Sequence, residues 1–573
     1  GNVILTTSGT AGHVTIDNGT TALGVQGTVS GDLVITSGEA IMDSAALSVT
    51  GTTTVTTDMA DKTITLDTLA STGAVLVTTS GTAGNVVIDN GTTGLDLGAS
   101  TISGTLSATS GAAAGIVDSG NVAVSGDVTL TTDANNGVIN LGTLQQSGGD
   151  LILTTNGTGD ATVVNNAAID LGASNVGGAL SATASAGTIT QNGGALTVAG
   201  TSAFTTSTAD QAITLSNTAN ALTGAVSLTT SGTAGHVTID NGTTALGVQG
   251  TVSGDFALTS GEAIIDSAAL SVTGTTTVTT DMADKTITLD TLASTGNVIL
   301  KTSGTAGHVT IDSGTTALGV QGTVSGNLVL TSGEAIIDSD VLTVTGTTTV
   351  TTDVADKAIN LGSLASTGNV IVSTLGTTGN VTIDNGTTAL GVQGTVSGDL
   401  VLTSGEAITD SDILTVTGTT KVTTDVADKA INLGSLASTG NVIVSTLGTT
   451  GNVTIDNGTT ALGVQGTIGG DLVLTSGQAI TDSGTLTASG STTIDSGSAD
   501  ITLDEVASTF GTLSLTGANV AVTDAGATDL GASTVSGTLG ITSGGAVTSS
   551  GKSAITGATT ISASGQAVSL TNS

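Results

Sequence analysis

The chain has 573 residues, of which 85 are Gly and three are Phe, and it contains no Trp, Tyr, Pro or Cys. Aromatic side chains usually fill the cores of globular domains this large, whereas here the 37% of hydrophobic residues are almost all Val, Ile, Leu and Ala. The 45 acidic residues outnumber seven Lys and give a net charge of -38, which excludes nucleic acid and anionic membrane surfaces as partners. This composition favours short β-strands and tight turns over disorder or collagen.

A glycine followed by an alternating aliphatic strand recurs along the whole chain at intervals of 71 to 76 residues. A period this regular indicates a solenoid, because each unit has an open face that only a neighbouring unit can cover. We predict a single continuous solenoid over residues 1–573, with seven full units and a partial eighth. The unit boundaries are 1–72, 73–148, 149–223, 224–295, 296–367, 368–439, 440–510 and 511–573.

Short strand-like runs follow one another through the first unit, from NVILTT at residues 2–7 to TLAST at 68–72. Three such runs fit one circuit of a triangular coil, and one unit holds about three circuits. We therefore predict an all-β fold, a right-handed parallel β-helix. About 24 coils spaced about 4.8 Å apart would form a rod roughly 115 Å long.

The first strand of each unit indicates which side chains point inward. The residues equivalent to Val3 and Leu5 are aliphatic in all eight units, whereas the residue between them changes from Ile4 to Ser227 or Ser514. Period-two alternation makes the aliphatic pair the core and the middle residue the surface. Because the surface residue is still aliphatic in six units, two interpretations stay open: scattered surface aliphatics, or an apolar stripe used for lateral bundling.

Units two, three and eight carry a variant motif, DLGASTISGTLSATSG from Asp96 and its counterparts from Asp170 and Asp529. GASTVSGTL in the eighth unit, TITQNGGALTVAGTSAF from Thr188 and AVTSSGKSAITGATTISASG from Ala546 resemble the repeats of filamentous-haemagglutinin-like exoproteins. The resemblance covers essentially the whole chain. It implies a right-handed parallel β-helix, secretion by the two-partner route, and a role in adhesion or in a biofilm matrix. The amino-terminal secretion domain of that family has no counterpart in this sequence.

An Asp ends the second strand-like run of many coils. If these residues stack at one corner, their carboxylates lie about 5 Å apart, and calcium binds oxygen-rich clusters of this kind. The alternative is that they form turns and face solvent. Both interpretations stay open, and no other metal or cofactor is predicted. The candidate calcium ligands are Asp17, Asp43, Asp67, Asp240, Asp266 and Asp290.

His13, His236 and His308 occupy equivalent positions that other units fill with Asn. Copies one unit apart would be separated by about 14 Å, which is too far to share a metal, so we expect polar turn residues. Four Lys residues each follow an Asp, as Lys62 follows Asp61, and we expect local charge balance there.

We predict no enzyme, because the chain has no Arg or Tyr and its three His are far apart. The predicted function is an extracellular structural or adhesive rod at a bacterial cell surface. It would be a segment of a giant surface protein, or a subunit that associates with its own copies end to end, with lateral association as an open alternative. The other expected partners are the cell surface or other cells. A monomeric calcium-stabilised stalk that binds carbohydrate or another surface is the alternative. An ice-binding solenoid ranks third, because the motif TGTTTVTT of residues 50–57 occurs on about one coil in three. No transmembrane segment is predicted.

Overall fold

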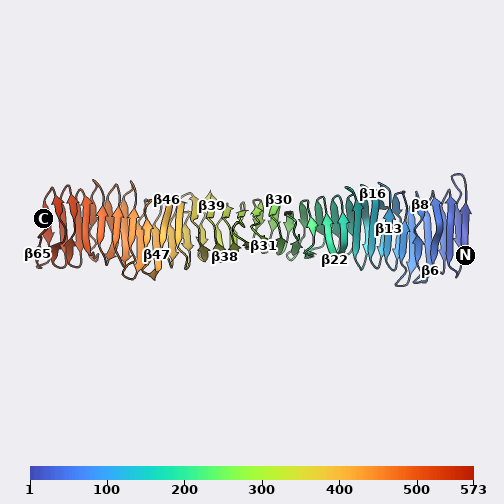
Figure 1. The fold of residues 1–573 in the computed structure, drawn as a ribbon, viewed down its shortest axis with the longest axis horizontal. Helices are drawn as coiled ribbons and strands as arrows, with labels where there is room; N and C mark the ends of the chain where they lie inside the picture. The colour runs from blue at the N-terminus through green and yellow to red at the C-terminus, as the bar shows by residue number, and fades with distance from the viewer. Residues whose placement is uncertain (573) are drawn as a thin grey trace. The chain divides into compact units, whose positions relative to one another are not determined.

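The computed structural model describes residues 1–572, which form two compact units divided between Gly296 and Asn297. Within the described residues every regular element is a β-strand, from β1 (Asn2–Thr6) to β65 (Val568–Ser569). In each unit the strands run parallel and stack side by side into long ladders, as Figure 1 shows for the blue-to-green and the yellow-to-red parts of the chain. Each unit is therefore a parallel β-solenoid, as predicted.

Successive strands belong alternately to two sheets, so each coil crosses one sheet and then the other. Val3 pairs with Val25 on the first sheet and Val14 pairs with Leu33 on the second, which places the next coil about 20 residues further along the chain. The strands of the first repeat are β1, β2 (Val14–Asp17), β3 (Leu23–Val29), β4 (Leu33–Ser37), β5 (Ile41–Val49), β6 (Thr53–Ala60), β7 (Ile64–Leu66) and β8 (Leu69–Ser71).

We call each crossing of a sheet by the chain a pass, so that one coil consists of two passes. Some passes are bent and others are short and straight. The β3–β5 ladder shifts register between Val25 and Gly27, and β7 and β8 are two halves of one pass that pair with opposite ends of β5. Gly27 has a φ of 116°, and a Cβ atom there would collide with the carbonyl oxygen of Leu5 in the preceding coil. A bent pass thus supplies two sides of a coil and a short pass such as β4 supplies the third, which accounts for the predicted triangular coil.

One repeat contains seven passes, because β7 and β8 count as one, and seven passes make three and a half coils. The prediction of about three coils per repeat is confirmed, and the structure adds the half coil. Because seven is odd, equivalent strands of consecutive repeats lie in opposite sheets. In the first unit β1 lies in one sheet and its equivalent β9 (Val75–Ser80) lies in the other. In the second unit β34 (Val298–Ser303) and β42 (Val370–Leu375) are related in the same way.

The core consists of stacked aliphatic side chains. Val75 and Val77 are buried, and Leu76 between them is partly exposed; Val226, Ser227 and Leu228 show the same alternation. This confirms the predicted inward and outward positions. Each fully buried aliphatic side chain contributes roughly 1.5 to 3 kcal/mol.

Once in each of five repeats, a buried Asn lies at the end of a short strand and bonds to the coil before it. The Asn90 Oδ1 atom accepts the Ser71 N–H at 2.7 Å, and its Nδ2 atom donates to the carbonyl oxygens of Ser71 and Gly94 at 2.9 and 2.8 Å. One side chain thereby satisfies backbone groups that a corner would otherwise leave unpaired. Other buried members of this set are Asn165, Asn241, Asn385 and Asn457.

Candidate functional surface

The three His side chains bond neighbouring coils. The Nδ1 atoms of His13 and His236 accept the backbone N–H groups of Asp32 and Asp255, both at 2.9 Å, and His308 accepts that of Asn327 at 2.8 Å. In other repeats Asn380 Oδ1 accepts the N–H of Asp399 at 2.8 Å in the same way. Both side chains place an acceptor at the same corner, which explains why His and Asn replace each other between repeats.

Asp43 and Asp266 are buried, with 7% and 9% of their surfaces exposed. Each carboxylate accepts the N–H groups of two consecutive residues in the next coil: Asp43 accepts those of Asp67 and Thr68 at 3.0 and 2.8 Å. We term this arrangement an aspartate clamp, and it holds the bend of the following pass. Burial raises the pKa of Asp43, although these N–H groups lower it. Clamps with a raised pKa for the same main reason occur at Asp266, Asp338, Asp410 and Asp482.

The other calcium candidates lie in turns or beside the clamps. Asp17 and Asp240 each accept an N–H two residues ahead, from Gly19 and Gly242, both at 2.9 Å. Asp67 donates its N–H to the first clamp, and Asp290 donates to the equivalent clamp of Asp266 at 3.0 Å. Within residues 1–572, no three His, Cys, Asp or Glu side chains gather closely enough to hold a metal ion.

Each of the four Lys residues that follow an Asp pairs with a Glu of the preceding coil instead of with the Asp beside it. Lys62 lies 2.9 Å from Glu39. Asp61, at a φ of 62°, accepts the N–H groups of Thr82 and Ala83 in the next coil, and these bonds lower its pKa. The charges balance between coils, and each of these half-exposed ion pairs contributes about 1 kcal/mol. The other pairs are Lys285–Glu262, Lys357–Glu334 and Lys429–Glu406.

Two equivalent open grooves lie on the second unit. The first, of about 340 Å³, is lined by Val341, residues 362–365, Asp384, Gly386 and Thr387. The second, of about 330 Å³, is lined by the residues 72 positions further on, including Ile413, Gly434 and Asp456. Val341 lies on β38 (Ile336–Val344) and Ile413 on β46 (Ile408–Val416), which belong to different sheets, so the grooves are on different sides of this unit. We refer to them below as the paired grooves.

The floor of each of the paired grooves is the bend held by a clamp. Asp338 accepts the N–H groups of Gly362 and Ser363 at 2.9 and 2.7 Å. Asp384 lies one coil above that bend, and its negative charge adds to the effect of burial in raising the pKa of Asp338. In the first repeat Ala46 and Asp67 stand where the fifth repeat has Val341 and Gly362. A sequence signal therefore existed: the repeats that have a larger aliphatic residue at the wall position also have Gly instead of Asp at the floor position.

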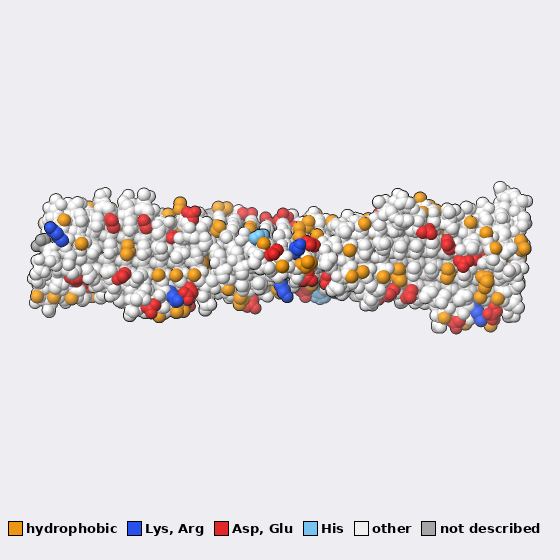
Figure 2. Space-filling view, in the orientation of Figure 1, with side chains coloured by type: hydrophobic (Ala, Val, Ile, Leu, Met, Phe, Trp, Pro, Cys, Tyr) orange, Lys and Arg blue, Asp and Glu red, His pale blue; other side chains and the backbone are white. Residues whose placement is uncertain are grey.

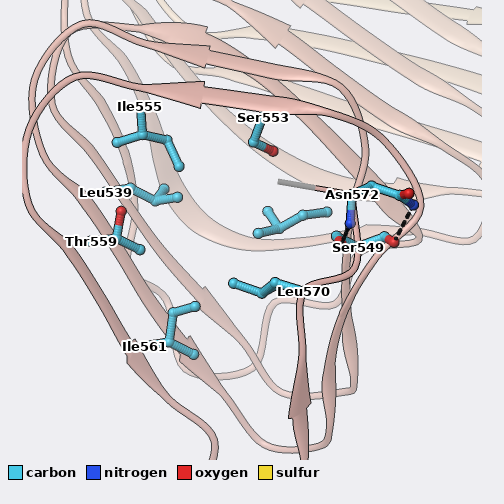
Figure 3. Close-up of a pocket in the computed structure, with 9 residues that line it drawn as sticks. Leu539, Ser549, Ser553, Ile555, Thr559, Ile561, Leu570 and Asn572 are labelled. Atoms are coloured by element: carbon cyan, nitrogen blue, oxygen red, sulfur yellow. Dashed lines mark hydrogen bonds between the residues drawn. The ribbon is translucent and has the colours of Figure 1, made fainter.

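A small cavity lies among the last coils, where several of the lining side chains are half-buried or exposed. It measures about 50 Å³ and is lined mainly by aliphatic side chains, among them Leu539, Ile555 and Leu570 (Figure 3). Asn572 at its edge donates to the Ser549 carbonyl oxygen at 2.9 Å. Its polar lining consists of Ser549, Ser553, Thr559 and Asn572. The described residues that line the cavity include no acidic or basic side chain to activate these hydroxyl groups.

The apolar stripe considered from the sequence is divided between two sheets. Ile4 lies in one sheet and the equivalent Leu76 in the other, so these side chains alternate between the sides of the first unit. On the face drawn in Figure 2, hydrophobic side chains occur singly or in small groups and are surrounded mostly by uncharged surface. This distribution favours scattered surface aliphatics.

Outward Thr side chains form columns that the sequence did not predict. Thr183, Thr205, Thr229 and Thr251 pair in register on four successive coils, although they come from different strand types. The adjacent outward column holds Ser181, Ala203, Ser227 and Gln249, so the hydroxyl array is one residue wide.

Parallel coils in each unit, bonded to one another through Asp, Asn and His side chains, define this chain as a β-solenoid repeat protein. It belongs to the family described as repeats of unknown function (DUF5649), which matches residues 11–80, 83–154, 158–229, 234–302, 306–375, 378–449, 450–516 and 517–573. No curated protein and no solved structure matches the chain. Among the described residues there is no helix with the length and apolar character needed to cross a membrane.

Proposed function

We propose that the chain is a non-enzymatic structural or adhesive rod outside a bacterial cell, either as a segment of a giant surface protein or as a subunit of a filament. One observation carries the proposal: side chains that could do chemistry are used to bond one coil to the next. His13 Nδ1 accepts a backbone N–H, and the Asp43 carboxylate holds two. The resemblance to filamentous-haemagglutinin-like repeats supports an adhesive or matrix role after two-partner secretion.

Continuous coil-to-coil bonding supports stiffness within each unit. Each backbone ladder adds hydrogen bonds between residues about 20 positions apart, and the clamps and Asn side chains add more at the corners. Because neighbouring coils cannot shift without breaking many bonds together, such a stack transmits force along its length. A support that holds binding surfaces away from a cell needs this property.

Electron microscopy of the purified chain over a wide concentration range tests the proposal. We expect straight rods that join end to end as the concentration rises, since strand edges at a coil stack can template further strands. Compact particles would overturn the rod. Isolated short rods at every concentration would reject the filament hypothesis and retain the hypothesis that the chain is a segment of a surface protein.

A calcium-stabilised stalk is a second candidate, because some carboxylates lie close enough to repel each other. The negative charge of Asp290 adds to the effect of burial in raising the pKa of Asp266. A bound cation would relieve that repulsion. Thermal melting with 1 mM calcium or with a chelator, at roughly constant ionic strength, decides between the candidates. An equal melting temperature rejects the stalk, and a higher one in calcium supports it.

The Thr column of the first unit supports an ice-binding surface only in part, since the array is one residue wide. We expect no thermal hysteresis in the purified chain. A measurable freezing-point gap would reverse this ranking.

A further inference from the structure

We infer that the paired grooves bind Lys or Arg side chains of a basic polypeptide partner. The inference rests on the proposed adhesive role and names the chemistry of the partner. Each groove combines an exposed aliphatic wall, a floor of backbone without a protruding side chain at its Gly, and a carboxylate on the opposite side. A long cationic side chain needs these three features, because its stem is apolar and its end is charged.

The aliphatic wall of each groove is largely exposed to solvent. Val341 and Ile413 are 55% and 62% exposed, although the equivalent residue of the first and fourth repeats is Ala. A large aliphatic side chain in water gains by contact with another apolar group. The methylene groups of a Lys or Arg side chain lying along the groove supply that contact.

The charges around each groove favour a cation. Asp384 lines the first groove, Asp338 lies beneath its floor, and the exposed Asp340 precedes Val341. The lining of both grooves contains no Lys. The net charge of -38 attracts basic partners over a longer range and raises their association rate. The occupant is therefore a cationic polypeptide and not a polyanion or an apolar protein surface.

The other repeats provide a matched control within the same chain. Where the wall is Ala46 or Ala269, the floor carries Asp67 or Asp290 instead of Gly. An Asp at the floor adds negative charge but occupies the space in which a stem would lie. General acidity and the groove geometry thus predict opposite effects of the same substitution.

Isothermal titration calorimetry with acetylated tetralysine amide, in about 150 mM NaCl, tests the inference. We expect two equivalent binding sites per chain. The variant Val341→Ala/Gly362→Asp/Ile413→Ala/Gly434→Asp carries two more negative charges, yet we expect its affinity to fall at least about five-fold. Equal or tighter binding by this variant would show that net charge alone attracts the peptide, and would overturn the inference.

Two further variants serve as controls. Val341→Ala/Ile413→Ala, which keeps both Gly residues, should weaken binding in the same direction. Deletion of residues 369–440 removes one repeat and joins Gly368 to Asn441, which should reduce the number of sites from two to one; two remaining sites would contradict the assignment. Rods seen by electron microscopy without peptide binding would reject the grooves alone, whereas compact particles would reject the proposed function whether or not the peptide binds.

Discussion

Single side chains at the corners account for much of the variation between repeats. His and Asn exchange freely where only an acceptor is needed, as His308 and Asn380 show. The buried Asn of the short-strand corner is more demanding, because it donates and accepts at once. Ser313 occupies this position in the fifth repeat, and its Oγ is one of four buried side-chain atoms without a partner in residues 1–572.

Replacing Ser313 by Asn should stabilise the chain by about 1 kcal/mol. The new amide would reach the carbonyl oxygens of Thr316 and Ala317, just as Asn385 donates to those of Thr388 and Ala389 at 3.1 and 2.9 Å. The reciprocal change Asn385→Ser should cost about 1 to 3 kcal/mol, since it leaves a buried N–H without an acceptor. Urea unfolding measures both, and equal stability of the two variants would contradict this account.

The clamps affect stability in one pH range, and Asp61 with its equivalents, such as Asp428, affects it in another. Burial raises the pKa of Asp410 above its ordinary value of 3.8. The folded state therefore favours the protonated carboxyl group. The stability that Asp410 contributes in this way is complete below pH 3.8 and is lost as the pH rises through the raised pKa. Hydrogen bonds from Thr450 and Thr449 lower the pKa of Asp428. Its contribution is present above 3.8 and is lost as the pH falls through the lowered value.

Denaturant unfolding between pH 2.5 and 7 should therefore separate two variants. Asp410→Asn should reduce the loss of stability as the pH rises above 3.8, and Asp428→Asn should reduce the loss as it falls below 3.8. Asn136 holds the position equivalent to Asp428 at a φ of 62°, so the second variant suits the backbone. The prediction fails if the two variants alter the same limb of the profile.

Among the elements, each bent pass with the sequence LGVQG depends on the second of its glycines. Gly250 in β28 (Leu246–Val252) has a φ of 114°, and a Cβ atom would meet the carbonyl oxygen of Leu228. Gly250→Ala should cost more than about 1 kcal/mol, because it adds both strain and a collision. Gly142→Ala is the control, since the nearest atom to its Cβ would be 3.9 Å away. Thermal unfolding of both variants measures the difference, which should vanish if the bulge tolerates a side chain.

At the scale of the whole molecule, the odd number of passes governs where features appear. The bent passes of one repeat lie in the opposite sheet from those of the next, so a feature returns to the same sheet only after two repeats. The paired grooves face different sides of their unit for this reason. Lateral contacts through any one repeated feature would accordingly form on both sides of a unit.

Removal of residues by whole repeats should be tolerated, because it rejoins equivalent points of the coil. We expect deletion of residues 369–440 to keep a single cooperative thermal transition near that of the full chain. Deletion of residues 369–404 joins unlike passes and should lower the melting temperature by several degrees. Circular dichroism measures both, and similar melting of the two deletions would mean that the repeat is not the structural unit.

The inward positions, the parallel coils and the approximate length of a repeat could be predicted from the sequence, because period-two alternation and repetition are local properties of the chain. The hydrogen-bond or ion-pair partner of each polar side chain could not be predicted from the sequence. Asp43 bonds to Thr68, Lys62 pairs with Glu39, and His13 accepts from Asp32, all about one coil away. Which residues meet across that distance depends on where each pass bends, and the bends are set by stacking on the neighbouring coil. Tertiary structure therefore decided which residues form the clamps, how the sheets alternate and where the side chains that vary between repeats meet to form the grooves.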